Sequence, residues 1–225
     1  MTSTFIKVCG ITRVSDALHA VEHGATALGF VLWPRSPRAI TVDRAAEIIA
    51  ELPSHVIAVG VFVNEPIDSI RSAADRAHLT AVQLHGDEPP AYADALDWPV
   101  FRAVSVEEID LAADAWSADT ALLVDNIDPV RRGGTGSAVD WTRAAGVAKT
   151  RKVVLAGGLT PENVAIAIRA VQPFGVDVSS GVEAAPGVKD LDKVAQFIAN
   201  ARFAFENVGA DVDVSPGVPR ANQRG

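Results

Sequence analysis

The sequence predicts one α/β domain, a single-domain (β/α)8 barrel of the TIM type, from two observations. Short apolar segments alternate with segments whose apolar residues recur at helical spacing, and this pattern occurs eight times. The chain has 225 residues, enough for one large domain, and no linker divides it. Parallel strands are apolar on both faces and need a crossover between neighbours. Eight strand–helix units in about 200 residues fit a compact closed barrel.

Each unit supplies one strand and one helix. Thr41 or Asp43 is placed to cap the second helix, and Pro66 lies in the first turn of the third. The predicted strands cover residues 5–9, 27–32, 56–63, 81–85, 100–104, 121–125, 152–156 and 176–179. The predicted helices cover residues 14–23, 42–52, 66–77, 88–96, 106–115, 139–148, 161–171 and 191–205.

An open, doubly wound sheet is the alternative architecture. Its usual signature is a glycine-rich turn after the first strand, and the sequence lacks that turn. We therefore expect residues 1–207 to form the barrel. Residues 208–225 combine glycine and proline with polar residues, a composition that predicts a mobile C-terminal tail.

Composition excludes several classes of protein. The net charge of −8 and the lack of a basic run argue against nucleic-acid binding, which depends on clustered Lys and Arg. A single cysteine allows neither an internal disulfide nor a cysteine-based metal site, and it fits a reducing compartment. The N-terminus shows no export signal, and no apolar stretch reaches about 18 residues. We therefore expect a cytoplasmic protein that does not enter the membrane.

The first strand brings Lys7 and Cys9 together. Alternate side chains of a strand share a face, so the two groups lie about 6–7 Å apart along it. A nearby cation lowers the free-energy cost of forming a thiolate, which would make Cys9 reactive. The alternative is that Cys9 is a small buried hydrophobic residue, and the first strand taken alone favours that alternative.

Active sites of such barrels lie at the carboxyl ends of the strands. Asp125 ends an otherwise apolar strand, where a carboxylate is costly to bury without a partner. We expect it to be functional, with a loop cap as the alternative. Gly157 and Gly158 follow the seventh strand, and Ser180 and Gly181 follow the eighth. Because backbone N–H groups of these two loops frequently bind phosphate, we predict a phosphate site, with ordinary turn glycines as the alternative.

Two further loops follow strand ends. Residues 133–136 (GGTG) lack the Lys-Ser/Thr end of a nucleotide-binding loop, so we interpret them as a flexible active-site loop. Arg35 and Arg38 follow the second strand, and a guanidinium group suits a carboxylate or a phosphate. Of the two, we expect Arg35 to lie in solvent.

No metal site is predicted. In residues 85–88 (HGDE), two carboxylates beside one histidine are more typical of an acidic cap at a helix N-terminus. His19 and His23 share a helix face four residues apart, but the glutamate general base of the metalloprotease motif is not in its place between them. We therefore do not assign that motif.

Together the motifs resemble the phosphoribosylanthranilate isomerase family. The likeness runs in order from residue 5 to about residue 205, and KVCGIT and SSGVE are its most specific parts. The segments that carry it are residues 7–12 (KVCGIT), 36–38 (SPR), 83–88 (QLHGDE), 123–125 (LVD), 133–136 (GGTG), 156–163 (AGGLTPEN), 177–183 (DVSSGVE) and 186–190 (PGVKD).

The resemblance implies an isomerase of tryptophan biosynthesis that acts by an Amadori rearrangement. The substrate would be N-(5'-phosphoribosyl)anthranilate and the product 1-(2-carboxyphenylamino)-1-deoxyribulose 5-phosphate. General acid–base catalysis needs no cofactor, and by the family pattern Cys9 matches the base and Asp125 the acid. Arg38 matches a clamp for the anthranilate carboxylate. The other substrate-binding residues implied are Lys7, His85, Gly134, Gly158, Asp177, Ser180 and Gly181, of which Asp177 orients the sugar or tunes Cys9. A monomer and a homodimer both fit.

Two other classes compete with this one. Another phosphosugar isomerase or epimerase would ordinarily carry paired aspartates and metal-binding histidines at the strand ends. A non-catalytic barrel that binds a phosphorylated ligand would keep the phosphate site without needing Cys9 or Asp125. The presence of both residues, at the ends of strands one and six, favours the isomerase.

Overall fold

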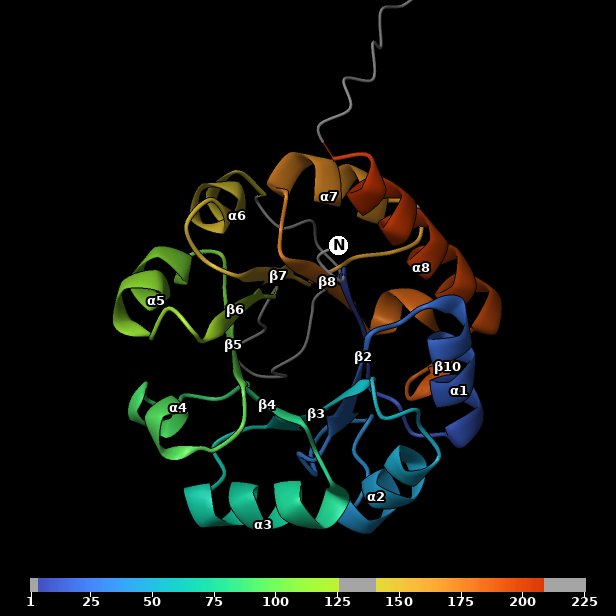
Figure 1. The fold of residues 1–225 in the computed structure, drawn as a ribbon, viewed down its shortest axis with the longest axis vertical. Helices are drawn as coiled ribbons and strands as arrows, with labels where there is room; N and C mark the ends of the chain where they lie inside the picture. Colours follow the sequence, from blue (N-terminus) through green and yellow to red (C-terminus); the bar gives the residue numbers. More distant parts are fainter. Residues whose placement is uncertain (1–3, 126–140, 209–225) are drawn as a thin grey trace, which may run out of the picture.

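The barrel predicted from the sequence is confirmed. The computed structural model describes residues 4–125 and 141–208. Eight parallel strands close in sequence order, and the helices form a ring around them (Figure 1). The strands are β1 (Phe5–Cys9), β2 (Ala27–Val31), β3 (Ile57–Phe62), β4 (Ala81–Leu84), β5 (Val100–Val104), β6 (Ala121–Val124), β7 (Val153–Leu155) and β8 (Gly175–Val178). The helices around them are α1 (Val14–His23), α2 (Val42–Ala50), α3 (Ile67–Ala77), α4 (Ala91–Ala95), α5 (Ile109–Ala115), α6 (Trp141–Ala148), α7 (Val164–Val171) and α8 (Leu191–Glu206).

Several helices begin later than the sequence predicts, and at α7 the cause is a turn that a polar side chain holds. At α7, Asn163 accepts a hydrogen bond from the Thr160 amide and donates one to the Gly158 carbonyl, which holds a turn in place of a first helical turn. At α3, Pro66 is the N-cap residue and not part of the first turn. The cap of α2 is Thr41, whose hydroxyl accepts from the Arg44 amide, and not Asp43.

One small element was not predicted. After β8 the chain forms a single 3-10 turn, η1 (Ser180–Val182), and then an antiparallel hairpin of β9 (Glu183–Ala185) and β10 (Val188–Lys189). These segments are too short for a strand pattern to show in the sequence. The hairpin brings Glu183 and Lys189 back to the end of β8, next to the predicted site. The predicted tail, residues 209–225, lies outside the described residues.

The barrel interior changes from apolar to polar along the strands. Towards the amino ends it is filled by a buried cluster that includes Phe5 of β1, Val59 of β3 and Phe101 of β5, with the Phe5 and Phe101 rings stacked at 5.3 Å. Burying a side chain of this size stabilises the fold by roughly 1.5–3 kcal/mol. The next layer holds Lys7 and Asp177, which are register partners on β1 and β8. An apolar floor therefore supports polar groups that face the carboxyl end.

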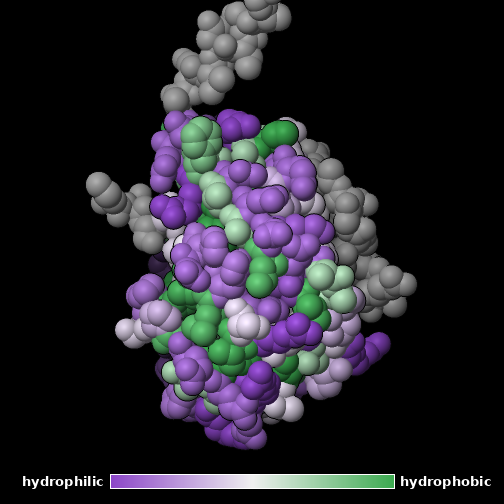
Figure 2. All heavy atoms as spheres, turned by 90° about the vertical axis from the view of Figure 1, so that its right-hand side faces the viewer, coloured by the Kyte–Doolittle hydropathy of each residue, from purple (hydrophilic) through white to green (hydrophobic). Residues whose placement is uncertain are grey.

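On the side where α1 and α8 lie, most of the surface is hydrophilic, with hydrophobic areas between the polar residues (Figure 2). Helix α8 packs between α7 and α1 and so completes the ring. Within residues 4–125 and 141–208, no helix is both long and apolar enough to cross a lipid bilayer.

Candidate active site

A cavity of about 460 Å³ opens at the carboxyl ends of the strands, where the fold places active sites. Cys9 of β1, Asp125 after β6 and Asp177 of β8 line it from different strands. The loop after β2 contributes Arg38. The remaining predicted residues on the wall are His85, Gly158, Ser180 and Gly181. The fold thus brings together residues that are far apart in the sequence.

Lys7 lies behind this wall and does not reach the solvent. Its side chain is fully buried, and its Nζ donates a hydrogen bond of 2.8 Å to Oδ2 of Asp177. Burial alone would lower the pKa of Lys7, but attraction to Asp177 and Cys9 outweighs it and the pKa is raised. Lys7 is therefore a fixed positive charge one layer below Cys9.

The thiol of Cys9 is harder to ionise than the sequence suggested. Burial raises its pKa, and the charge of Asp177 raises it further. Lys7 lowers the pKa, but by less, so the net shift is upward. We expected Lys7 to lower the free-energy cost of forming the thiolate, and it does. The correction is that burial, with the charge of Asp177 added to it, outweighs the effect of Lys7, so that the pKa of Cys9 is raised and the free protein favours the thiol.

Asp125 faces a buried histidine across the cavity. Its Oδ2 lies 3.9 Å from Nε2 of His85, with only 15% of the Asp125 side chain exposed. The amide of Gln83 lies 2.9 Å from Nδ1 of His85. An amide N–H donates, so Nδ1 accepts, and the neutral ring then carries its proton on Nε2, towards Asp125. Gln83 thereby orients a ring that the sequence analysis placed only as a substrate contact.

Arg38 is held by a carboxylate that the sequence analysis did not assign. Its Nε and Nη2 donate to the two oxygens of Glu183, both at 2.8 Å. Burial would raise the pKa of Glu183, but Arg38 and Lys189 hold it below its ordinary value. Lys189 contacts Glu183 at 3.1 Å, and its own pKa is lowered by burial. This bidentate pair fixes the guanidinium plane at the mouth of the cavity.

The loops after β7 and β8 approach each other closely. Gly157 and Gly158 both have φ of +70°, a left-handed conformation that favours glycine. A Cβ atom on Gly181 would lie 1.9 Å from the Leu159 carbonyl oxygen, which leaves no room for a side chain. The two loops thus present small residues and backbone to the cavity, as the predicted phosphate site requires.

Glu88, at the end of residues 85–88, makes other contacts than the sequence predicts. Glu88 is not a cap for α4, which begins at Ala91 without a side-chain cap. Its carboxylate instead accepts from the amides of Asn64 and Gly86 and pairs with Arg102 at 2.8 Å. The acidic-cap reading is therefore wrong. Glu88 ties the loops after β3 and β4 to β5 and so supports the wall that carries His85.

The predicted site residues other than Gly134 are described, and they gather around this cavity. Gly134, with the whole of residues 133–136, lies outside the described residues. Glu183, Lys189 and Gln83 were not predicted as site residues, although each lies in a segment that carries the family resemblance. Arg35 is exposed as expected, and its guanidinium lies 5.4 Å from the ring centre of Trp33.

A closed barrel with a polar cavity at the carboxyl ends of its strands, lined by a thiol and two carboxylates, defines a (β/α)8-barrel enzyme. Comparisons with known proteins give the family. The family model described as N-(5'-phosphoribosyl)anthranilate (PRA) isomerase matches residues 6–200. The chain belongs to this family and is an isomerase of tryptophan biosynthesis, as its motifs indicated.

Individual relatives agree. The N-(5'-phosphoribosyl)anthranilate isomerase of Pelobacter propionicus is 48% identical over 198 residues, which cover 88% of this chain and 95% of the relative. The crystal structure of phosphoribosyl anthranilate isomerase from Thermotoga maritima superposes with a TM-score of 0.83 at 44% identity, covering 89% of this chain and 99% of the other.

A further crystal structure of such an enzyme, in complex with reduced 1-(o-carboxyphenylamino)-1-deoxyribulose 5-phosphate, has a TM-score of 0.79 and 42% identity. It covers 89% of this chain and 99% of its own.

Proposed function

We propose that this chain isomerises N-(5'-phosphoribosyl)anthranilate with Cys9 as the general base and Asp125 as the general acid. The observation that carries this division of roles is that the thiol and the carboxylate face one cavity from β1 and β6. Two groups of different chemistry on separate walls can act on two ends of one reacting unit. Side chains alone supply both proton transfers.

The reaction needs two proton transfers by side chains, and a keto–enol tautomerisation follows them. Asp125 protonates the furanose ring oxygen as the bond between that oxygen and C1 breaks, which leaves a protonated Schiff base. Cys9, having lost its thiol proton to water, then removes the proton from C2 as thiolate, and the electron pair of the C2–H bond forms the C1–C2 double bond while the nitrogen becomes neutral. The resulting enol loses its hydroxyl proton and gains one at C1, which gives the ketoamine. No oxidant or reductant is consumed.

The raised pKa of Cys9 fits a base that ionises only when substrate is present. In the free protein, burial and Asp177 favour the thiol. A protonated Schiff base adds a positive charge beside the sulfur, and Lys7 already supplies one from behind. Both charges favour the thiolate. The thiolate is thus formed at the step that uses it. Asp177 opposes the effect of Lys7 on the pKa of Cys9 and so limits the fraction of thiolate.

Substrate binding follows from the charges at the rim. Arg38 lies at the cavity mouth with its plane fixed by Glu183, and a planar guanidinium suits the anthranilate carboxylate. The backbone near Gly158, Ser180 and Gly181 receives the phosphate through its N–H groups. His85 and Gln83 lie beside Asp125 and contact the sugar end.

An activity assay with purified protein tests the function directly. We expect it to convert N-(5'-phosphoribosyl)anthranilate without added metal or cofactor and to complement a tryptophan auxotroph that lacks this isomerase. A chain that neither complements nor isomerises overturns the proposal. The cytoplasm stays the expected location, and size measurement in solution decides between monomer and homodimer.

A further inference from the structure

Lys189 of β10 carries a buried positive charge that the proton transfers of the reaction do not use. Its side chain is fully buried, and it is not among the described residues that line the cavity. Its Nζ donates hydrogen bonds of 3.1 Å to the Ser179 carbonyl oxygen and to Oε1 of Glu183. Because a buried ammonium group is costly to desolvate, partners of this kind must compensate it. Lys189 thus joins the loop after β8 to the carboxylate that holds Arg38.

The backbone that carries Lys189 is fixed as well. Its amide donates a hydrogen bond of 3.0 Å to Oδ2 of Asp16, a buried residue of α1. In the same hairpin, the Gly187 carbonyl oxygen accepts a hydrogen bond from the Thr12 hydroxyl. The hairpin of β9 and β10 is therefore anchored to the start of α1 and to the segment before it. The ammonium group extends from this anchored backbone to the Ser179 carbonyl oxygen.

The contact with Ser179 determines the direction of a backbone N–H group at the cavity. A peptide group is planar and trans, so its carbonyl oxygen and its N–H point in opposite directions. The Ser179 carbonyl oxygen is directed to Lys189, and the Ser180 N–H of the same peptide group is then directed away from Lys189. Ser179 and Ser180 both line the cavity, whereas Lys189 does not. The N–H is thus held on the side where backbone N–H groups would receive the phosphate.

The charges around this point favour anions. Glu183 neutralises one of its two cationic partners, Arg38 and Lys189, and both of them hold its pKa below the ordinary value. Burial lowers the pKa of Lys189, and the charge of Glu183 opposes this effect. The group of three therefore keeps an excess of positive charge beside the two ends of the cavity at which a carboxylate and a phosphate are expected.

We propose that Lys189 is a positioning residue that holds the Ser179–Ser180 peptide group in the direction that phosphate binding requires. Glu183 contacts the same ammonium group but serves the other end of the substrate, because both of its oxygens accept from Arg38. This inference rests on the proposed function, which places the phosphate and the anthranilate carboxylate at these two ends. A purely structural role of Lys189 would weaken both ends alike.

Binding of two separate ligands, inorganic phosphate and anthranilate, tests the inference by titration calorimetry. In Lys189→Met, which removes the charge and the donors, the affinity for phosphate should fall at least about tenfold and that for anthranilate by less than about threefold. In Glu183→Gln the affinity for anthranilate should fall at least about tenfold, while phosphate binding is not weakened. Glu183 keeps Arg38 as its partner in Lys189→Met, so this variant should fold, which circular dichroism checks. Its KM for the substrate should rise more than its kcat falls.

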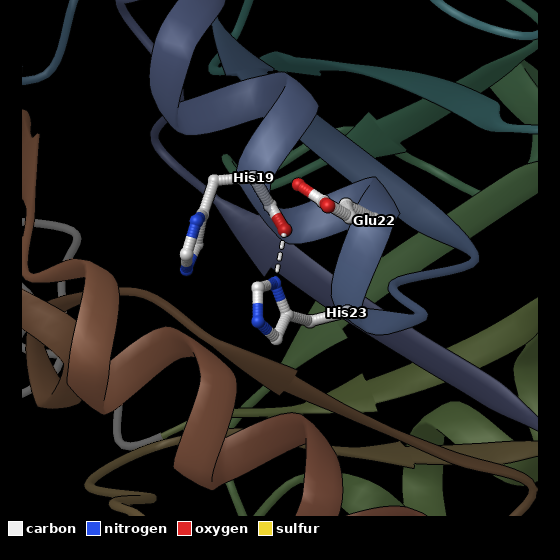
Figure 3. A group of neighbouring side chains, drawn as sticks. All are labelled: His19, Glu22 and His23. Carbon is white, nitrogen blue, oxygen red and sulfur yellow. Dashed lines mark hydrogen bonds between the residues drawn. The ribbon is translucent and has the colours of Figure 1, made fainter.

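Each variant has a matched control with the same substitution at an exposed position. Lys149→Met changes a lysine directly after α6, and Glu22→Gln changes a glutamate of α1 that lies beside His19 and His23 (Figure 3). Neither control should alter the affinity for phosphate or for anthranilate. A loss of phosphate binding in Lys149→Met would show that the effect reflects net charge and not the contact with Ser179, and it would overturn the inference.

The amide signal of Ser180 gives a direct readout of the peptide group. Phosphate should shift the ¹⁵N–¹H signal of Ser180 in the wild type, and the shift should be lost in Lys189→Met. Unchanged phosphate affinity in Lys189→Met, equal losses for both ligands, or a wild type that binds no phosphate overturns the inference. A wild type that binds both ligands but does not isomerise the substrate overturns the proposed function instead.

Discussion

Nζ of Lys7 and Oδ2 of Asp177 are 2.8 Å apart in the barrel interior, one layer below Cys9. The two residues are register partners on β1 and β8, so the closure of the barrel itself forms this pair. Their opposite charges act on one sulfur in opposite directions. The ionisation of Cys9 therefore depends on how the charge of Lys7 is divided between a neighbouring carboxylate and the thiol.

The titration of Cys9 should move in opposite directions in two variants. Lys7→Met removes the charge that favours the thiolate and should raise the pKa of Cys9 further. Asp177→Asn removes the charge that opposes it and should lower the pKa, provided that Lys7 keeps its proton. The rate of alkylation by iodoacetamide against pH reports the thiolate, and Cys9 is the single cysteine of the chain. The same direction of shift in both variants would refute this account.

Stability should also depend on the pair being complete. Lys7→Met leaves a buried carboxylate without its partner and should cost about 3–5 kcal/mol in the free energy of unfolding. The double variant Lys7→Met/Asp177→Leu leaves no charge behind and should recover most of this loss. Urea unfolding followed by circular dichroism measures both. If the double variant is no more stable than Lys7→Met, desolvation of the unpaired carboxylate is not the cause.

Gly181 should tolerate no side chain. In Gly181→Ala the new Cβ would meet the Leu159 carbonyl oxygen at 1.9 Å, so the loops after β7 and β8 must separate. We expect KM for the phosphorylated substrate to rise at least about tenfold, the scale of about 1.4 kcal/mol of lost binding.

The matched control is Gly146→Ala in α6, where an added Cβ meets nothing within 4 Å. It should leave KM unchanged and stabilise the helix by up to about 1 kcal/mol. Equal KM values in the two variants would show that phosphate binding does not depend on the close approach of the two loops.

Arg38 and Arg35 offer a second matched comparison. Lysine cannot make the two parallel hydrogen bonds that Arg38 makes with Glu183, nor present a planar fork to a carboxylate. Arg38→Lys should therefore raise KM by at least about tenfold, with a smaller effect on kcat. Arg35 also lines the cavity, but its exposed guanidinium lies over the Trp33 ring, so Arg35→Lys, which keeps the charge, should raise KM less than Arg38→Lys does. Steady-state kinetics decides, and a normal KM in Arg38→Lys would exclude the clamp.

The alternation of apolar strands and amphipathic helices was enough to predict the barrel, because each strand is buried on both faces. Helix starts were less predictable, since Asn163 makes turn hydrogen bonds that compete with a helix. The hairpin of β9 and β10 is too short to show a period. For that reason the contact between Glu183 and Arg38 was not predicted, although Glu183 lies in a segment that carries the family resemblance.

The lining of the cavity was predictable where a reactive side chain stands at a strand end, as at Cys9 and Asp125. The ionisation of Cys9 was not, because it depends on a contact between residues that are 170 positions apart. From the sequence, Lys7 was a cation beside a thiol. In the fold it is a cation shared between a thiol and a carboxylate, and burial of the thiol outweighs it, so the pKa of Cys9 is raised.

The most direct measurement is kcat of Cys9→Ala and of Asp125→Ala, with the affinity of each variant for the reduced product measured alongside. Our account predicts that each substitution lowers kcat by at least about 10²-fold while that affinity is largely kept, since an acid or a base acts on the transition state. Circular dichroism confirms that the variants fold. Full activity in either variant would contradict the role given to that residue.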